Sequence, residues 1–327
     1  MPTTAFLFPG QGSQRVGMGR DLVAEHPDLV DRYYRVADDV LGMDLTRLCF
    51  EGPTDALRRT EITQPAVFLS SLVALDVLRR RGVQATVVAG HSLGEYTALV
   101  AAGVLEWTDA LQLVRRRGEL MAAVNERSAG GMAAVLGLSV EAVEALCGTV
   151  RERRGTVVEV ANHNDPGQVV VSGHISAVAE ASLLARDAGA ERVVRLDVGA
   201  AFHCSLMREV EPQFDAALDR VAFREPQIPV VANVTAAPVT SAAEARKRLR
   251  QQLAGRVRWT ETMRRLATFG VDSVIEVGPG RVLCGFARAT RPDIAAYGGG
   301  ELRRIRHALT ALSTGTDSYE APSRLAA

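Results

Sequence analysis

The segment Gly90-His91-Ser92-Leu93-Gly94 is the part of the chain best suited to nucleophilic chemistry, and it directly follows the apolar run Val87–Ala89. A serine at the apex of a sharp strand-to-helix turn is pushed out of the sheet, and the next backbone N–H can face a developing oxyanion. A glycine–serine turn before a helix is also ordinary loop chemistry. The pattern favours a serine nucleophile at Ser92 and needs support from the rest of the chain.

Arg117 is a cation in the middle of an apolar stripe. A helix from Thr108 through Val124 places one face toward the interior, composed of Ala110, Leu113, Val114, Arg117, Met121 and Val124. An inward guanidinium needs a partner, because an unpaired buried charge is strongly destabilising. The pattern predicts either an internal ion pair or a receptor that grips a substrate carboxylate through two parallel N–H···O bonds.

His203 is a polar ring that follows the otherwise apolar run Val198–Phe202. A neutral imidazole, with an ordinary pKa of about 6.5, can deprotonate a serine. A histidine with a purely structural role is the alternative. The two can be distinguished only by whether the fold brings His203 to Ser92.

The elements around these residues indicate an α/β fold with a parallel sheet. The apolar run Phe6–Phe8 predicts a strand ending in the glycine-rich loop Pro9–Gln14, and Ala98–Ala102 lies in a helix after the serine turn. The loop lacks the third glycine of a dinucleotide fingerprint and the lysine of a P-loop, so a phosphate cradle is a weak interpretation.

Residues 130–200 have a different order of elements, which predicts an inserted ferredoxin-like βαββαβ unit. We expect strands and helices in the order Met132–Leu136, Val140–Cys147, Val157–Val160, Val169–Val171, Ile175–Ala188 and Val193–Val198. The larger unit then comprises 1–129 and 201–290, with a helix over 205–221 and strands at Val230–Val231 and Val274–Val277. Residues 291–327 are expected to form a short basic helix and a flexible tail, and the junction of the two units a cleft.

Composition limits the possible function classes. The 327 residues are 47% hydrophobic and 23% charged with zero net charge, which argues against a nucleic-acid or membrane partner. The four cysteines have no paired spacing, which fits a reducing cytoplasm. We see no signal peptide and no span of sufficient apolar length, and no long apolar surface, so we expect a cytoplasmic monomer.

Further motifs establish a family resemblance that covers roughly residues 5–290. They occur in family order: Phe8–Gln14, Thr63–Ala66, Gly90–Glu95, Arg117-Gly118, Ala161-Asn162 with Asn164, Pro166–Val170, Phe202-His203 and Gly278–Gly280. The chain resembles the malonyl-CoA:acyl carrier protein transacylases of fatty acid synthesis and the acyltransferases of polyketide synthases. The resemblance implies an α/β-hydrolase-like large subdomain with an inserted ferredoxin-like small subdomain.

The resemblance assigns roles to named residues. Ser92 is the nucleophile and His203 the general base, with a backbone or amide oxygen in place of a triad carboxylate. The backbone N–H groups of Gln11 and Leu93 form the oxyanion hole, and Arg117 binds the malonyl carboxylate. The substrate-binding set is completed by Met121, Asn162, Phe202 and Gln252.

The implied reaction is a ping-pong transfer of a malonyl group from malonyl-CoA to the phosphopantetheine thiol of an acyl carrier protein, with no bound cofactor or metal. The Phe202-His203 pair resembles the malonyl type of polyketide acyltransferase, whereas Ser-His is common in methylmalonyl enzymes. Arginine clusters at Arg246–Arg250, Arg264-Arg265 and Arg303–Arg306 are solvated faces, or one of them receives an acidic carrier.

Three other functions remain open at this point. One is an editing thioester hydrolase on the same scaffold, against which the retained Arg117 argues. Another is an unrelated serine hydrolase whose third member is Asp197 or Asp272. The last is a carrier-binding scaffold without catalysis. Pathway, carrier identity and tolerance of other extender units are not determined by these residues.

Overall fold

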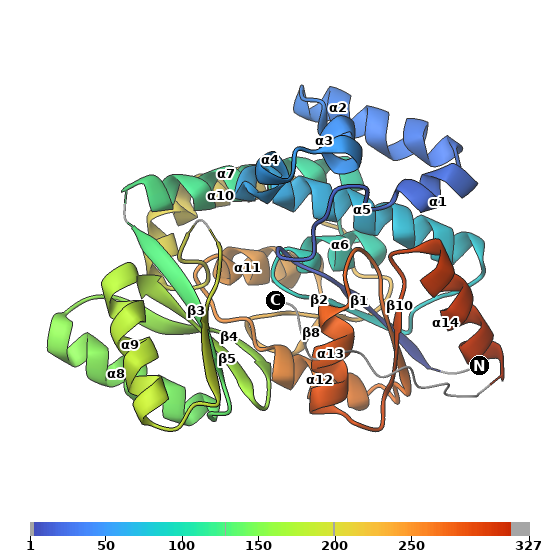
Figure 1. The fold of residues 1–327 in the computed structure, drawn as a ribbon. Coiled ribbons are helices and arrows are strands. Elements are labelled where there is room, and N and C mark those ends of the chain that lie inside the picture. The colour runs from blue at the N-terminus through green and yellow to red at the C-terminus, as the bar shows by residue number, and fades with distance from the viewer. Residues whose placement is uncertain (1–2, 128, 199, 315–327) are drawn as a thin grey trace.

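The computed structural model describes residues 3–127, 129–198 and 200–314 (Figure 1). Its strands form two separate sheets. The larger sheet contains β1 (Thr4–Phe8), β2 (Val87–Gly90), β7 (Val230–Val231), β8 (Pro238–Val239), β9 (Ser273–Glu276) and β10 (Ala295–Gly298). The smaller sheet contains β3 (Gly130–Leu136), β4 (Val158–Asp165), β5 (Gln168–His174) and β6 (Arg192–Arg195).

Helices account for most of the remaining described residues. Those before the small sheet are α1 (Arg20–Glu25), a π-helical turn (Val30–Arg35), α2 (Val36–Leu41), α3 (Leu45–Glu51), α4 (Thr54–Arg58), α5 (Thr60–Arg80), α6 (Gly94–Ala101) and α7 (Trp107–Arg127). Those that follow are α8 (Val140–Arg154), α9 (Ile175–Asp187), a 3₁₀ turn (Ser205–Val210), α10 (Glu211–Leu218), α11 (Ala242–Gln252), α12 (Trp259–Ala267), α13 (Val282–Thr290) and α14 (Leu302–Thr314).

The larger sheet is the centre of a three-layer sandwich, with strand order β10-β9-β1-β2-β7-β8 and only the β7–β8 pair antiparallel. Alternate residues of β1 face opposite layers, as the two-residue period of a strand requires. Phe6 and Phe8 join the core beneath α5, α6 and α7, whereas Ala5 and Leu7 join the core beneath α12 and α13. The predicted parallel α/β sheet is confirmed.

The smaller sheet has the order β4-β5-β3-β6 and is antiparallel throughout, which is the ferredoxin-like arrangement predicted from the βαββαβ order. One face carries α8 and α9 around Val135, Val143 and Val171. Met132 and Val170 on the other face join the large core cluster. The small sheet therefore lies between its own helices and the rest of the molecule (Figure 1).

Several predicted boundaries are wrong in detail. The helix expected to begin at Thr108 begins one residue earlier, and the helix expected over 205–221 is divided into a 3₁₀ turn and α10. The strand predicted to reach Val198 ends at Arg195. β10 adds a parallel edge strand beyond residue 290, where we expected only a helix and a tail. The expected flexible tail at 315–327 lies outside the described residues, as does Gly199.

Helix α5 is long and apolar enough to cross a membrane by length and composition, so the expectation that the chain has no such segment was wrong. Its most apolar window is 94% buried inside the structure. It packs on α7, and Gly118 of α7 lies against the first turn of α5. A Cβ at Gly118 would lie 2.8 Å from Glu61 Cα and 3.0 Å from the carbonyl oxygen of Thr60. Helix α5 is thus a core helix, and its close contact with α7 fixes the position of the neighbouring Arg117.

We predict that Gly118→Ala lowers the free energy of unfolding by roughly 1–3 kcal/mol, because the new methyl group meets backbone atoms that cannot yield locally. Gly148→Ala in α8 is the matched control, since its Cβ would meet only Arg151 Nη2, at 4.0 Å. That control should be neutral or stabilise by about 0.5–1 kcal/mol through helix propensity. Urea unfolding of both variants decides the point, and equal effects would refute the close-approach argument.

Candidate active site

The serine turn lies at the carboxyl edge of the larger sheet, between β2 and α6. Ser92 has φ 50°, a left-handed conformation that is uncommon for a residue with a side chain. The flanking glycines are required by space: a Cβ at Gly90 would lie 2.0 Å from the carbonyl carbon of Gly94, and one at Gly94 would lie 2.0 Å from the carbonyl oxygen of Phe8. The local sequence therefore forces a tight turn that presents the Ser92 hydroxyl beyond the strand ends.

His203 meets Ser92 although 110 residues separate them in the chain. Its Nε2 lies 2.6 Å from Ser92 Oγ. Its Nδ1 lies 3.0 Å from the carbonyl oxygen of Gln252 and 3.1 Å from that of Gly255. Since carbonyl oxygens only accept, Nδ1 carries the proton and donates it, and Nε2 is left to accept the serine O–H.

The His203 ring is 3% exposed, and burial followed by the nearby Arg117 charge lowers its pKa to about 3. The imidazole is therefore neutral over the physiological range, which is the state that a general base needs. The serine-hydrolase alternative with an acidic third member is wrong. Asp197 is 96% exposed and pairs with Arg58, and Asp272 is exposed, while the oxygens bound to Nδ1 are the two carbonyls.

Arg117 is 1% exposed and has no acidic partner among the described residues. Its Nη2 donates to Ser92 Oγ at 3.0 Å and to Gln252 Oε1 at 3.2 Å, and its Nη1 donates to Gln64 Oε1 at 2.8 Å. Its Nε has no partner in the described part of the chain, and the Tyr96 ring lies 5.7 Å from its Cζ. Of the two roles considered for this arginine, an internal ion pair is therefore excluded within the described residues.

Gln252 connects the cation, the nucleophile and a buried carboxylate. Its Nε2 donates to the carbonyl oxygen of Ser92 at 2.8 Å and to Glu95 Oε2 at 2.7 Å, while its Oε1 faces Arg117. Glu95 is 1% exposed, and burial raises its pKa to about 7. Sequence analysis quoted Glu95 within the serine motif without giving it a role. The structure places the side-chain amide of Gln252 between the Glu95 carboxyl group and the Arg117 guanidinium.

The first loop lies beside the serine turn because β1 and β2 are adjacent parallel strands, with Phe8 opposite Gly90. Parallel strands bring the loops at their carboxyl ends together. Among the described backbone bonds, the N–H groups of Gln11 and Leu93 have no acceptor, so both are free to bind an oxygen. The Gln11 side chain is anchored separately, by a 3.2 Å bond from its Nε2 to Thr60 Oγ1.

The other three predicted substrate-binding residues surround this centre. Met121 is 1% exposed, and its Sδ accepts from Gln64 Nε2 at 3.5 Å, which orients the amide that faces Arg117. Phe202 is 7% exposed and immediately precedes His203. Asn162 lies in β4, where it forms an isolated parallel bridge with Val257.

Sequence reasoning gave no role to three polar residues that hold the serine turn, namely His91, Asn164 and Asn233. His91 Nε2 lies 2.9 Å from Asn164 Oδ1, which ties the turn to β4 of the small sheet. Burial lowers the pKa of His91 to about 4. Asn233 accepts the N–H of Ser92. The motif positions of His91 and Asn164 were a usable signal, whereas Asn233 stands in no motif that the sequence analysis recognised.

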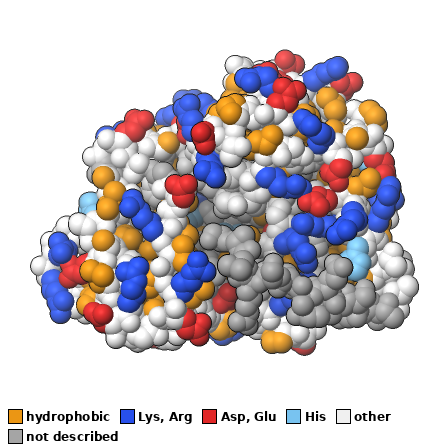
Figure 2. Space-filling model, in the orientation of Figure 1, with side chains coloured by type: hydrophobic (Ala, Val, Ile, Leu, Met, Phe, Trp, Pro, Cys, Tyr) orange, Lys and Arg blue, Asp and Glu red, His pale blue; other side chains and the backbone are white. Residues whose placement is uncertain are grey.

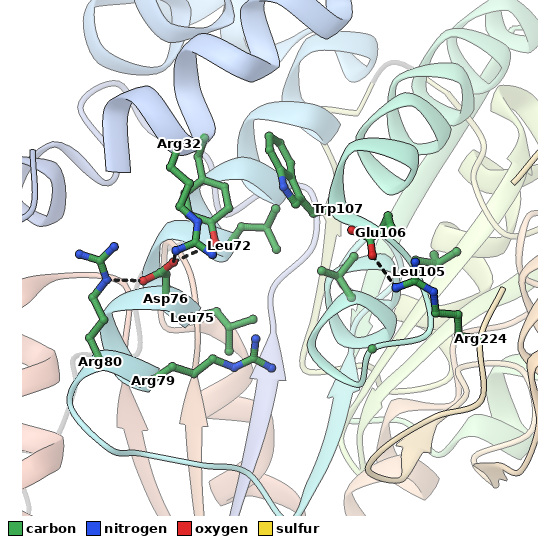
Figure 3. A pocket seen from close by; sticks show the side chains of 13 residues that line it. Arg32, Leu72, Leu75, Asp76, Arg79, Arg80, Leu105, Glu106, Trp107 and Arg224 are labelled. Carbon is green, nitrogen blue, oxygen red and sulfur yellow. Dashed lines mark hydrogen bonds and ion pairs between the residues drawn. The ribbon is translucent and has the colours of Figure 1, made fainter. Parts of the chain in front are cut away.

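A pocket of about 510 Å³ lies away from the dyad, along the later half of α5 (Figure 3). Its charged lining groups bind one another or the backbone. Asp76 is held by Arg32 and Arg80, Arg79 donates to the carbonyl oxygen of Ala101, and Arg224 pairs with Glu106. This pocket therefore offers no cation comparable to Arg117. No described group of three or more His, Cys, Asp or Glu residues is placed to hold a metal ion.

Comparison with known proteins identifies the family. The family model of the acyl transferase domain matches residues 5–294. The chain belongs to the acyl transferase family. It is 38% identical over 318 residues to a Bacillus subtilis protein named malonyl CoA-acyl carrier protein transacylase, which covers 97% of this chain and all of that one.

Solved structures of other acyltransferases share the fold. The malonyl-CoA:acyl carrier protein transacylase of Xanthomonas oryzae has a TM-score of 0.91 at 38% identity, covering 95% of this chain and 98% of that one. A type II polyketide synthase acyl carrier protein complexed with its malonyl-transacylase gives a TM-score of 0.90 at 38% identity, covering 94% of this chain and 99% of that one. The predicted α/β-hydrolase-like fold with a ferredoxin-like insertion is confirmed.

The two shifted pKa values predict the pH dependence of acyl-enzyme formation. In Glu95→Gln, the rate constant at saturating acyl-CoA should stay constant from pH 8 to pH 5, because His203 protonates only near pH 3. In the unmodified chain, any inflection near pH 7 then belongs to Glu95, whose carboxylate is lost as pH falls. Single-turnover acylation across this range is the measurement. A fall centred near 6.5 in the glutamine variant would show that His203 titrates as an ordinary histidine.

Proposed function

We propose that this acyltransferase moves a malonyl group from malonyl-CoA to the phosphopantetheine thiol of an acyl carrier protein. The observation that carries the proposal is the buried Arg117 guanidinium, which has no acidic partner in the part of the chain that the structure describes and lies 3.0 Å from Ser92 Oγ. The relatives named above as malonyl-CoA transacylases and the carrier-bound structure support the donor and the acceptor.

In the first half-reaction, Ser92 Oγ attacks the thioester carbonyl and gives its proton to Nε2 of His203. The negative charge that develops on the carbonyl oxygen is met by the free N–H groups of Leu93 and Gln11. The tetrahedral intermediate then collapses, the C–S bond breaks, and the coenzyme A sulfur leaves with the proton from the imidazolium. The product is a malonyl ester of Ser92.

In the second half-reaction the same groups act in reverse order. The carrier thiol gives its proton to His203 and attacks the serine ester, and the same two N–H groups bind the oxyanion. The C–O bond to serine then breaks, and Ser92 recovers its proton from His203. The two half-reactions use one site, so the kinetics are ping-pong.

Selection of the acyl group follows from the charge on Arg117. A malonyl carboxylate can pair with the guanidinium, whose Nε is unpartnered within the described chain. An acetyl group leaves the cation unpaired in a desolvated site, at a cost of about 1–3 kcal/mol. The Phe202 ring beside His203 favours malonyl over acids with an α-substituent, because it restricts space near the α-carbon.

Surface charges bear on the carrier protein, and the state of the cysteines bears on the cell compartment. Most of the predicted arginine clusters are neutralised within the fold: Arg246 and Arg250 pair with Asp219, and Arg306 pairs with Glu25. Figure 2 shows acidic and basic side chains interspersed over one face of the molecule. All four cysteines are free and buried, which supports a cytoplasmic enzyme.

We predict that Ser92→Ala abolishes the malonyl-enzyme, because no other described hydroxyl contacts His203 Nε2. Intact-protein mass spectrometry after mixing with malonyl-CoA should show the malonyl mass increase in the unmodified chain only. Ser71→Ala in α5, a buried serine outside the dyad, is the control and should retain the adduct. An adduct that persists in Ser92→Ala would refute the nucleophile, and free malonate without carrier acylation would identify a hydrolase.

We predict that Arg117→Ala weakens the preference for malonyl-CoA over acetyl-CoA, because it removes the cation that recognises the distal carboxylate. The ratio of kcat/KM for malonyl-CoA to that for acetyl-CoA should fall by about 10- to 100-fold. Arg116→Ala, one residue away on the outer face of α7 and paired with Glu119, is the control and should leave the ratio unchanged. An unaltered ratio in Arg117→Ala would contradict the carboxylate role.

A further inference from the structure

Asn233 is a buried residue at the serine turn that plays no part in the chemistry described above. It follows β7 by two residues, and β7 pairs with β2, with Ala89 opposite Val231. Its side chain is fully buried. Because β2 and β7 are adjacent and parallel, the residue that follows β7 lies beside the residues that follow β2.

The Asn233 amide spans the turn with two short hydrogen bonds to backbone. Its Oδ1 accepts from the N–H of Ser92 at 2.7 Å, and its Nδ2 donates to the carbonyl oxygen of Gly90 at 2.6 Å. Its own N–H donates to Glu95 Oε2 at 3.3 Å, and its carbonyl oxygen accepts from the N–H of Arg258 at 2.9 Å. One side chain therefore joins β7 to both arms of the turn, and its backbone joins the same point to α6.

The left-handed backbone of Ser92 needs such support. A residue with a side chain holds φ 50° only where its surroundings fix it. The Ser92 N–H cannot enter the hydrogen-bond ladder of α6, and Asn233 is its acceptor. Binding it there also directs the Ser92 N–H away from the substrate, so that the N–H of Leu93 remains the free donor of the turn.

We propose that Asn233 is a positioning residue for acyl transfer, whose side-chain amide locks the serine turn so that Ser92 Oγ stays between His203 and Arg117. This inference rests on the proposed role of Ser92 as the nucleophile. It also explains the residue type. An acceptor and a donor must be presented on one short planar group, which asparagine does and aspartate, serine and alanine do not.

Asn233→Asp gives a test that a merely structural role would not satisfy. An ionised carboxyl group keeps the acceptor for Ser92 N–H but turns a second acceptor toward the carbonyl oxygen of Gly90. A protonated carboxyl group restores both bonds, since its O–H can donate to Gly90. Burial and the adjacent carboxylate of Glu95 favour that protonated form.

Other titratable and charged groups face the same region: His91 and Glu95 on the serine turn and α6, Arg117 on α7, His203 before the 3₁₀ turn, and Arg248 on α11, whose charge acts on Glu95. They are present in every variant. Rates are therefore compared as the ratio of each variant to the unmodified chain at the same pH. The ratio removes the titration that both chains share, and in Asn233→Asp it reports the new carboxyl group together with Glu95.

The experiment is single-turnover acylation by malonyl-CoA and acetyl-CoA from pH 5 to pH 8, followed by intact-protein mass spectrometry. Asn233→Ala should lower the saturated rate constant by about 100-fold for both donors, with little change in half-saturating concentration and an unchanged malonyl-to-acetyl ratio. For Asn233→Asp, the ratio of its rate constant to that of the unmodified chain should rise toward one as pH falls. For Asn233→Ala, the same ratio should not change with pH. Asn125→Asp in α7 is the control. Among the described residues Asn125 accepts only the N–H of Gly130, so the ratio of its rate to the unmodified rate should be near one at every pH.

Three outcomes overturn the proposal: an alanine variant that acylates at the unmodified rate, an alanine variant that loses malonyl selectivity, or an aspartate variant that stays as slow as the alanine variant down to pH 5. If the alanine variant does not fold, as judged by circular dichroism, the aspartate series alone decides. A failure of the proposed nucleophile would be seen separately. In that case Ser92→Ala would still form the malonyl adduct, whatever the rates of the Asn233 variants.

Discussion

The whole site depends on one charge that the fold buries without neutralising. Arg117 is 1% exposed and is surrounded by amide oxygens, a hydroxyl and an aromatic ring rather than by carboxylates. Burying a cation in this way is costly, and the hydrogen bonds from Gln64 and Gln252 offset only part of the lost hydration. The carboxyl group of Glu95 does not pair with the guanidinium directly, because the Gln252 amide stands between the two groups. A ligand with a free carboxylate is the partner that this arrangement lacks.

The architecture brings distant segments of the chain together around Ser92 and Arg117. Parallel pairing of β1, β2 and β7 places the first loop, the serine turn and Asn233 at one edge of the sheet. The packing of α7 against α5 fixes the position of Arg117 in the interior. Gln252 is the last residue of α11. His203 comes from the segment that leaves the small sheet, so the residue that we propose as the general base is positioned by the junction of the two sheets.

The sequence predicted those parts of the site that have a local signature. The glycines around Ser92 are needed by contacts under 3 Å, so the turn is encoded locally, and the helical stripe correctly oriented Arg117. The ferredoxin-like unit followed from its order of elements. Two features escaped prediction. β10 is short and made of mostly small residues, so its sequence does not stand out as a strand, and α7 begins at Trp107 rather than at Thr108. Asn233 and Glu95 act through side chains far apart in sequence, which periodicity cannot reveal.

The most direct test of the unneutralised cation changes the substrate and leaves the protein intact. Acylation of Ser92 by malonyl-CoA is compared with acylation by its terminal amide, malonamyl-CoA, which has almost the same shape and no charge. Single-turnover kcat/KM should be about 10- to 100-fold lower for the amide, because the guanidinium then lacks its carboxylate. Equal values for the two donors would show that Arg117 does not read the charge of the acyl group, and the account of this enzyme's selectivity would be wrong.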